Sequence, residues 1–198
     1  MCFFILNFGE YLKHLTMRAS LIVIATAMLL PGACQSYQDY SKAGWHEKDL
    51  PDWENLAVNT VNTEKPHATM VSFPDNAATL NAGWRESDNV MSLDGKWKFS
   101  FANTPAERPY WFFKDDYDTR SWSDIEVPST WEREGYGIPY YVNIGYSFKK
   151  NPPFIDHSDN PVGSYKRSFI LPSGWRKNEI FLTFDGVSSA FYVWVNGE

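Results

Sequence analysis

From about residue 90 onward, the chain consists of short β-branched and aromatic runs separated by Gly, Pro, Asn and Asp. Such a pattern is typical of an all-β domain, because strands need only a few residues of period-two alternation between turns. No helical pattern of useful length competes with it. We therefore expect a β-sandwich of the jelly-roll, galactose-binding-like kind. Strands are predicted at residues 97–101, 125–127, 165–171, 179–184 and 191–195.

The run FYVWV near the end of the chain is apolar on both of its faces. Phe191, Val193 and Val195 share one face, while Tyr192 and Trp194 share the other. A strand of this kind lies inside a sheet that is covered on both faces, or under a segment that covers its second face.

Asn196-Gly197 follows that run and is a strong signal for a two-residue type I′ hairpin turn. After such a turn the chain should return as an antiparallel strand, yet the sequence stops one residue later. A strand that lacks its partner exposes unpaired N–H and C=O groups. We therefore expect the sandwich to be incomplete at its C-terminal end and the sequence to be the first part of a longer protein.

The N-terminal region contains an apolar run, Ala19–Leu30, that follows the basic Arg18. The run is shorter than the roughly 20 residues that cross a bilayer, and it fits a secretory signal. The small residues before Cys34 are similar to a bacterial lipoprotein box, which makes Cys34 a lipidation candidate. The alternative is ordinary signal-peptidase cleavage with Cys34 unused. In both cases we expect export, to the periplasm or the outer membrane of a bacterium.

These signals divide the chain into three parts. Residues 1–34 are expected to be a signal peptide or lipoprotein leader, 35–89 a linker and irregular arm, and 90–198 the jelly-roll domain. No cysteine follows Cys34, so no disulfide framework is available. Because 43% of the residues are apolar and 17% aromatic, burial can hold the fold together instead.

Several kinds of chemistry find no support in the sequence. The formal charge of −6 includes no clustered basic face, which argues against nucleic-acid partners. The four histidines stand far apart without ligand spacing, so no metal site is predicted and surface or hydrogen-bonded histidines are expected. The carboxylate pairs Asp115-Asp116 and Glu132/Glu134 lie in polar turns, with nothing nearby to separate their pKa values. No catalytic residue is predicted.

The segment at residues 140–154, YYVNIGYSFKKNPPF, sustains neither helical nor strand periodicity and is predicted to be an ordered loop. Sugars are bound by stacking on aromatic rings and by directional hydrogen bonds from amides. Alternatively, most of these rings are packing residues, since aromatic side chains tend to be buried. Asn143 differs from them, because an amide buried among rings must be hydrogen-bonded. The candidate sugar-binding side chains are Trp131, Tyr136, Tyr140, Tyr141, Asn143 and Tyr146.

Six blocks between Asp52 and Glu198 resemble, in order, the amino-terminal part of a family 2 glycoside hydrolase, a β-galactosidase of the large bacterial type. The blocks are DWEN with a downstream KPHA, SLDGKWKFSF, VPSTWEREGYGIPYYVNIGYSF, NPPF, DNPVGSYKRSF and FDGVSSAFYVWVNG.

That resemblance implies retaining hydrolysis of terminal β-galactosides by two barrel glutamates that lie beyond residue 198, so that this part alone is inactive. It implies that Asn143 contacts galactose in the first subsite and that Tyr140, Tyr141 and Tyr146 support the loop. It also implies magnesium and sodium in the complete enzyme, with no cofactor assigned to this part, and it is compatible with a homo-oligomer.

Two other functions remain open at this point. One is a carbohydrate-binding module without an enzyme attached, which would need a closed sandwich. The other is a different family 2 glycosidase, such as a β-glucuronidase.

Overall fold

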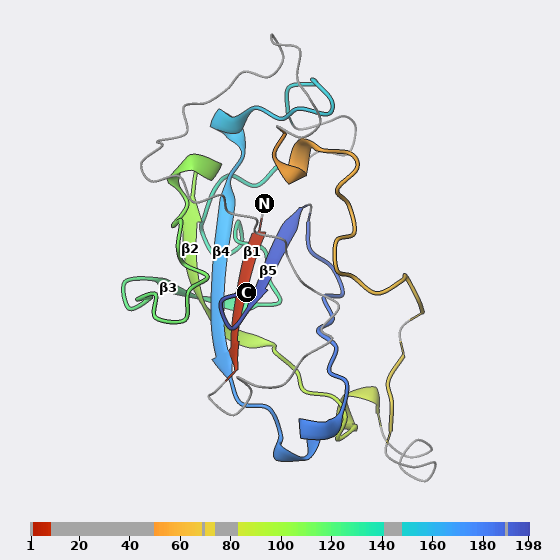
Figure 1. Cartoon of the computed structure of the whole chain (residues 1–198). Helices are drawn as coiled ribbons and strands as arrows, with labels where there is room; N and C mark the ends of the chain where they lie inside the picture. The colour runs from red at the N-terminus through yellow and green to blue at the C-terminus, as the bar shows by residue number, and fades with distance from the viewer. Residues whose placement is uncertain (1, 9–49, 69, 74–82, 141–147, 189) are drawn as a thin grey trace.

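The computed structural model describes residues 2–8, 50–68, 70–73, 83–140, 148–188 and 190–198 (Figure 1). Within these residues the regular structure is one five-stranded sheet with short 3₁₀ helices and no α-helix, as expected for an all-β chain. The strands are β1 (Cys2–Phe8), β2 (Gly95–Ala102), β3 (Ser123–Val127), β4 (Val162–Phe169) and β5 (Phe191–Val195).

The strands lie in the order β3-β2-β4-β1-β5. β2 pairs antiparallel with both β3 and β4, whereas β1 runs parallel to β4 on one side and to β5 on the other. Gly95 begins β2 with a φ of 117°, a conformation that glycine adopts without steric cost. β2, β3 and β5 confirm the predicted strands, and β4 begins three residues before its predicted start at residue 165.

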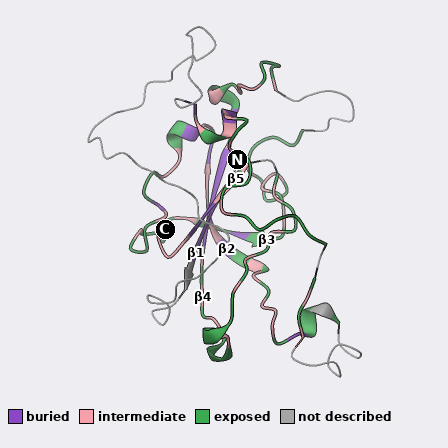
Figure 2. Ribbon diagram, turned by 45° about the vertical axis from the view of Figure 1, so that its right-hand side comes forward, coloured by how far each residue is buried: buried purple, intermediate pink, exposed green. Residues whose placement is uncertain are grey.

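Side chains pack on both faces of the sheet, and the buried residues follow its central strands (Figure 2). Each large side chain that is fully buried contributes about 1.5–3 kcal/mol to folding. On β5, Val193 belongs to one cluster and Trp194 to the other, which confirms the prediction that this strand is covered on both sides. The first cluster contains Cys2, Phe4, Leu6, Trp97, Phe99, Ile125, Tyr165 and Val193, and the second contains Ile5, Ala102, Phe112, Val162 and Trp194.

β1 was not predicted from the sequence, because it lies within the expected leader. Its sequence, CFFILNF, is apolar enough to fill an interior strand position, and Ile5 and Leu6 are fully buried. The two side chains enter opposite clusters, as the alternation of a strand requires. The division of the chain after residues 34 and 89 stays a prediction.

The predicted strand at 179–184 is wrong as a hydrogen-bonded element, although the predicted alternation is present. Ile180, Leu182 and Phe184 are half-buried, whereas Phe181 is 57% exposed. Leu182 and Phe184 pack against the first cluster. The segment pairs with no strand of the described chain, and period-two burial without a ladder partner does not make a strand.

The predicted type I′ turn at Asn196-Gly197 is confirmed. Both residues have positive φ, 53° and 87°. The backbone N–H of Val195 donates to the carbonyl oxygen of Glu198 at 2.8 Å, and the N–H of Glu198 donates back at 3.2 Å. This reciprocal pair closes a two-residue hairpin turn.

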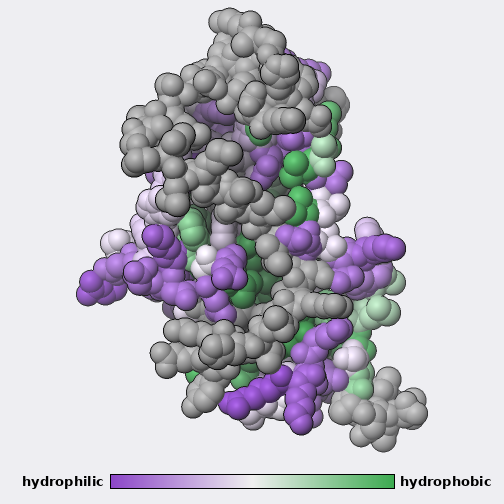
Figure 3. Space-filling model, viewed as in Figure 1, coloured by the Kyte–Doolittle hydropathy of each residue, from purple (hydrophilic) through white to green (hydrophobic). Residues whose placement is uncertain are grey.

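The described residues between β1 and β2 contain no strand and run along the outside of the sheet (Figure 1). They include two short 3₁₀ helices, η3 (Asp52–Glu54) and η4 (Trp84–Glu86). On the face shown in Figure 3, described hydrophilic side chains gather at the flanks and hydrophobic ones are visible between them. Among the described residues, no helix has the length and hydrophobicity needed to cross a bilayer.

Candidate functional site

Tyr140 is the one loop residue of the predicted sugar site that the structure describes. Its side chain is 54% exposed, and its ring lies 6.3 Å from that of Phe148, between centroids. The ring is therefore accessible to a ligand. The other predicted site residues, Tyr141, Asn143 and Tyr146, lie outside the described residues, as does the lipidation candidate Cys34.

Trp131 and Tyr136, which also belonged to the candidate sugar-binding set, pack against the core instead. The Trp131 ring meets Phe101 edge-on at 5.6 Å, and the Tyr136 ring meets Phe99 at 4.8 Å. Both residues are half-buried against the first cluster. The packing interpretation of these two rings is confirmed, because burial against the sheet satisfies them without a ligand.

The chain that leads into the loop is held in a tight turn. The N–H of Tyr136 donates to the carbonyl oxygen of Trp131 at 3.0 Å. Gly135 and Gly137 both have positive φ, at 91° and 69°, which non-glycine residues adopt only with strain. The turn fixes the direction in which the chain leaves the sheet toward Tyr140.

The chain that leaves the loop is fixed by a second set of bonds. The N–H of Phe154 donates to the carbonyl oxygen of Asn151 at 2.8 Å, which closes a turn around Pro152 and Pro153. Asp156 then caps η6 (His157–Asp159), because its carboxylate accepts hydrogen bonds from the N–H and the hydroxyl of Ser158 at 2.9 and 2.6 Å. Those two bonds lower the pKa of Asp156.

Glu54 of the arm reaches this outgoing segment, and sequence reasoning did not find it. Its side chain is 1% exposed. Oε1 of Glu54 accepts a hydrogen bond from the N–H of Ile155 at 3.0 Å and lies 2.8 Å from Nε2 of His157. The ring of Trp53 also contacts His157 edge-on, at 6.2 Å. The conspicuous WEN block was the signal that could have drawn attention to this contact.

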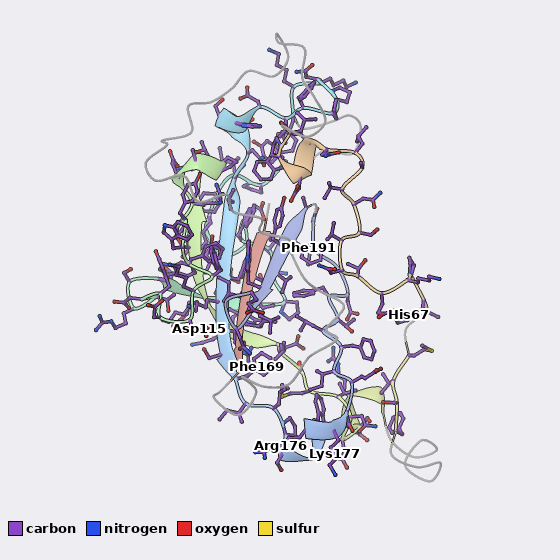
Figure 4. The ribbon with its side chains drawn as sticks, viewed as in Figure 1. His67, Asp115, Phe169, Arg176, Lys177 and Phe191 are labelled. Carbon is purple, nitrogen blue, oxygen red and sulfur yellow. The ribbon has the colours of Figure 1, made fainter. Side chains whose placement is uncertain are left out.

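The remaining predicted features lie apart from the loop. His67 is exposed on the arm, with its Nδ1 2.7 Å from the carbonyl oxygen of Ala68 (Figure 4). Asp115 and Asp116 are exposed, and Glu134 is exposed with one oxygen accepting from the hydroxyl of Ser129 at 3.1 Å. Across the described chain, no three His, Cys, Asp or Glu side chains gather closely enough to hold a metal ion.

The described chain is an all-β domain in which Tyr140 is exposed between two turns that backbone hydrogen bonds close. The family model described as the sugar binding domain of glycosyl hydrolases family 2 matches residues 90–198. This match covers more than half of the chain, and the chain therefore belongs to that family.

Proteins named beta-galactosidase are its relatives. The chain is 44% identical over 165 residues to the one from Halalkalibacterium halodurans, which covers 80% of this chain and 15% of the relative. It is 39% identical over 146 residues to the protein from Psychromonas ingrahamii, a match that covers 74% of this chain and 14% of the relative. It is 37% identical over 153 residues to the protein from Priestia megaterium, a match that covers 75% of this chain and 15% of the relative. The chain thus spans about one seventh of the length of these relatives.

Proposed function

We propose that this chain is the N-terminal part of a retaining β-galactosidase that hydrolyses terminal β-D-galactosides. The observation that carries the proposal is the family match over residues 90–198, together with 37–44% identity to three beta-galactosidases. In the proposed enzyme, one glutamate acts as acid/base and a second forms a covalent galactosyl intermediate. Both glutamates lie beyond residue 198.

The proposed role of this part is to shape the galactose subsite. The amide of Asn143 would hydrogen-bond to ring hydroxyls and so orient the sugar for attack. Tyr140, Tyr141 and Tyr146 would support the loop, and the exposure of the Tyr140 ring agrees with a position beside a ligand. Orientation of this kind raises the fraction of bound substrate that is ready to react.

The 198-residue chain is proposed to be inactive alone. Retaining hydrolysis requires two carboxyl groups about 5–5.5 Å apart on either side of the scissile bond. In the described chain, Asp115, Asp116 and Glu134 are exposed in turns, which is unlike the enclosed setting of a catalytic carboxyl pair.

The proposal extends to the setting of the complete enzyme. Magnesium and sodium would be bound by residues of the longer protein, and we assign no ligand to the part described. Export with Cys34 as the lipidated residue would place the enzyme in the periplasm or on the outer membrane, with a lipid anchor as its only membrane contact. A homo-oligomer is compatible with the proposal.

The test is an assay of the complete protein and of the 198-residue chain with an aryl β-galactoside and, in parallel, an aryl β-glucuronide. We expect release of the aryl group from the galactoside by the complete protein alone. Hydrolysis of the glucuronide instead would replace the proposed substrate. Binding of galactosides by the complete protein without hydrolysis of either compound would identify a carbohydrate-binding module and overturn the enzyme proposal.

A further inference from the structure

Glu54 is a buried carboxylate whose hydrogen bonds join two parts of the chain that are far apart in sequence. It lies in the 3₁₀ helix of the arm, and its partners Ile155 and His157 follow 101 and 103 positions later. In Figure 1 the orange helix η3 lies beside the segment around η6 at the same end of the sheet. The arm and the outgoing side of the loop thus meet through one side chain.

Burying a carboxylate is energetically unfavourable, and in Glu54 both contacts are made by Oε1, whereas the buried Oε2 has no hydrogen-bond partner among the described residues. Burying a charged group without partners disfavours folding strongly, whereas hydrogen bonds to a charged acceptor are stronger than neutral ones. Oε1 of Glu54 accepts from a backbone N–H and lies within hydrogen-bond distance of an imidazole nitrogen. Both contacts go to the three-residue stretch from Ile155 to His157, so they restrain its position and its direction.

The stretch from Ile155 to His157 directly follows the predicted 140–154 loop. The preceding turn, closed by Phe154 and Asn151, joins it directly to the end of the 140–154 loop. On the other side, the bond between Tyr136 and Trp131 fixes the chain that leads to Tyr140. The described residues on either side of 141–147 are therefore each fixed, those before it by the sheet and those after it by the arm.

We propose that Glu54 is a positioning residue, by which the arm sets the end of the 140–154 loop and hence the fit of the galactose subsite. This inference rests on the proposed function. Glu54 touches no substrate in this scheme and acts through the backbone N–H of Ile155 and the ring of His157. The arm therefore contributes to sugar affinity, in addition to connecting the N-terminal region to the domain.

The chain supplies a matched control in Glu86. This glutamate is likewise the last residue of a 3₁₀ helix before β2, but it is exposed, and its Oε2 accepts from the local N–H of Gly83 at 3.1 Å. Glu86→Ala thus removes a carboxylate of the same type without touching the loop. Glu54→Gln retains an acceptor oxygen of the same reach, whereas Glu54→Ala removes it.

The first measurement is steady-state hydrolysis of an aryl β-galactoside by the complete enzyme and its three variants. We expect Glu54→Ala to raise KM by about three- to tenfold, the scale of one lost hydrogen bond of this type, with Glu54→Gln between it and the parent. Glu86→Ala should leave KM unchanged. KM separates positioning from simple loss of folded protein, because a smaller folded fraction lowers only the maximal rate.

The second measurement is amide hydrogen exchange of Ile155 in the folded protein. Glu54→Ala should speed exchange at this amide relative to Glu86→Ala, because its acceptor is gone. Unchanged KM and unchanged exchange in Glu54→Ala, with an active parent, would overturn the inference and leave the proposed function standing. A parent that hydrolyses no β-galactoside overturns the proposed function itself, and the two failures are thereby distinct.

Discussion

The indole ring of Trp131 lies directly against the backbone of Gly163. A Cβ atom added to Gly163 would stand 2.6 Å from Cζ3 and 2.7 Å from Cε3 of the ring, closer than such atoms approach in real structures. On its other side the same Cβ would lie 2.9 Å from Cε2 of Phe99. Gly163 therefore lets the turn at 131–137 pack onto β4 through the ring of Trp131.

Gly163→Ala should lower the free energy of unfolding by about 1–3 kcal/mol, because the added methyl group must displace packed rings. Urea denaturation of the 198-residue chain measures the change. Gly174→Ala is the control, since a Cβ at Gly174 has no atom within 4 Å. Equal stability of the two variants would show that the ring and the strand can separate freely.

Lys166 is a buried residue of β4. Its Nζ donates a hydrogen bond to the carbonyl oxygen of Lys114 at 2.7 Å. Burial lowers the pKa of its ammonium group from 10.5, an effect that the charges of Asp115 and Asp116 oppose. The unfolded chain therefore keeps this proton to a higher pH than the folded chain does. The free energy of unfolding rises with pH between the folded pKa and the unfolded pKa of 10.5. Below the folded pKa the lysine is charged in both states, and this gain in stability is absent.

Lys166→Met should abolish this increase. We expect the stability difference between parent and Lys166→Met, followed by urea denaturation from pH 7 to pH 10.5, to move in favour of the parent with increasing pH. A constant difference across the range would contradict a lowered pKa. Lys98→Met, which removes a partly exposed lysine paired with Asp124 at 2.8 Å, controls for the loss of a positive charge.

Asp118 forms an exposed pair with Arg120, with Nη2 and Oδ2 2.7 Å apart. Hydrogen bonds from Arg120 lower the pKa of the Asp118 carboxyl group from 3.8 to about 2. Because the folded pKa is the lower one, any stabilisation is present above pH 3.8 and is lost as the pH falls toward 2. The chemical shift of the carboxyl carbon, followed by NMR, should titrate near pH 2 in the parent and at a higher pH in Arg120→Ala, which loses the side-chain hydrogen bonds but keeps the backbone N–H that donates to Oδ1 of Asp118. Asp118→Asn should barely change the thermal midpoint, since exposed pairs are screened.

Sequence patterns predict which segments are apolar and where turns fall, but they do not predict which strands pair. β5 was predicted with its observed bounds because FYVWV is apolar on both faces and a turn signal follows it. The segment at 179–184 carries an equally good alternation and is not a strand, because pairing depends on a neighbour that the alternation does not specify. β1 was missed for the related reason that an apolar run near the N-terminus fits a leader as well as a core strand.

For the candidate site, the sequence predicted the types of side chain but not their burial or their long-range partners. Residue type identifies aromatic and amide side chains, but it does not separate Tyr140, which is exposed, from Tyr136, which packs on Phe99. The contact between Glu54 and Ile155 spans more than a hundred positions, and a short sequence pattern holds no information about such a pairing. Long-range contacts of this kind become visible only when the chain is folded.

Asn143→Ala in the complete enzyme should lower kcat/KM for an aryl β-galactoside by roughly ten- to a hundredfold, the scale of losing one or two well-placed hydrogen bonds to the sugar. The thermal midpoint should remain close to that of the parent. Asn151→Ala is a control, because the turn at Asn151 uses its backbone carbonyl and its exposed side chain faces solvent. Equal kcat/KM in Asn143→Ala and parent would remove Asn143 from the proposed subsite.

Cys2 offers a direct chemical test of the position of β1 in the sheet. Burial raises the pKa of its thiol from 9.0 to about 11, which lowers the thiolate fraction at pH 8 by roughly a hundredfold. Because the thiolate is the form that reacts, iodoacetamide should modify Cys2 at least about a hundredfold more slowly in the folded 198-residue chain than in guanidinium chloride. Mass spectrometry of the N-terminal tryptic peptide measures both rates. Similar rates in the two conditions would show that β1 does not occupy its place between β4 and β5 in solution.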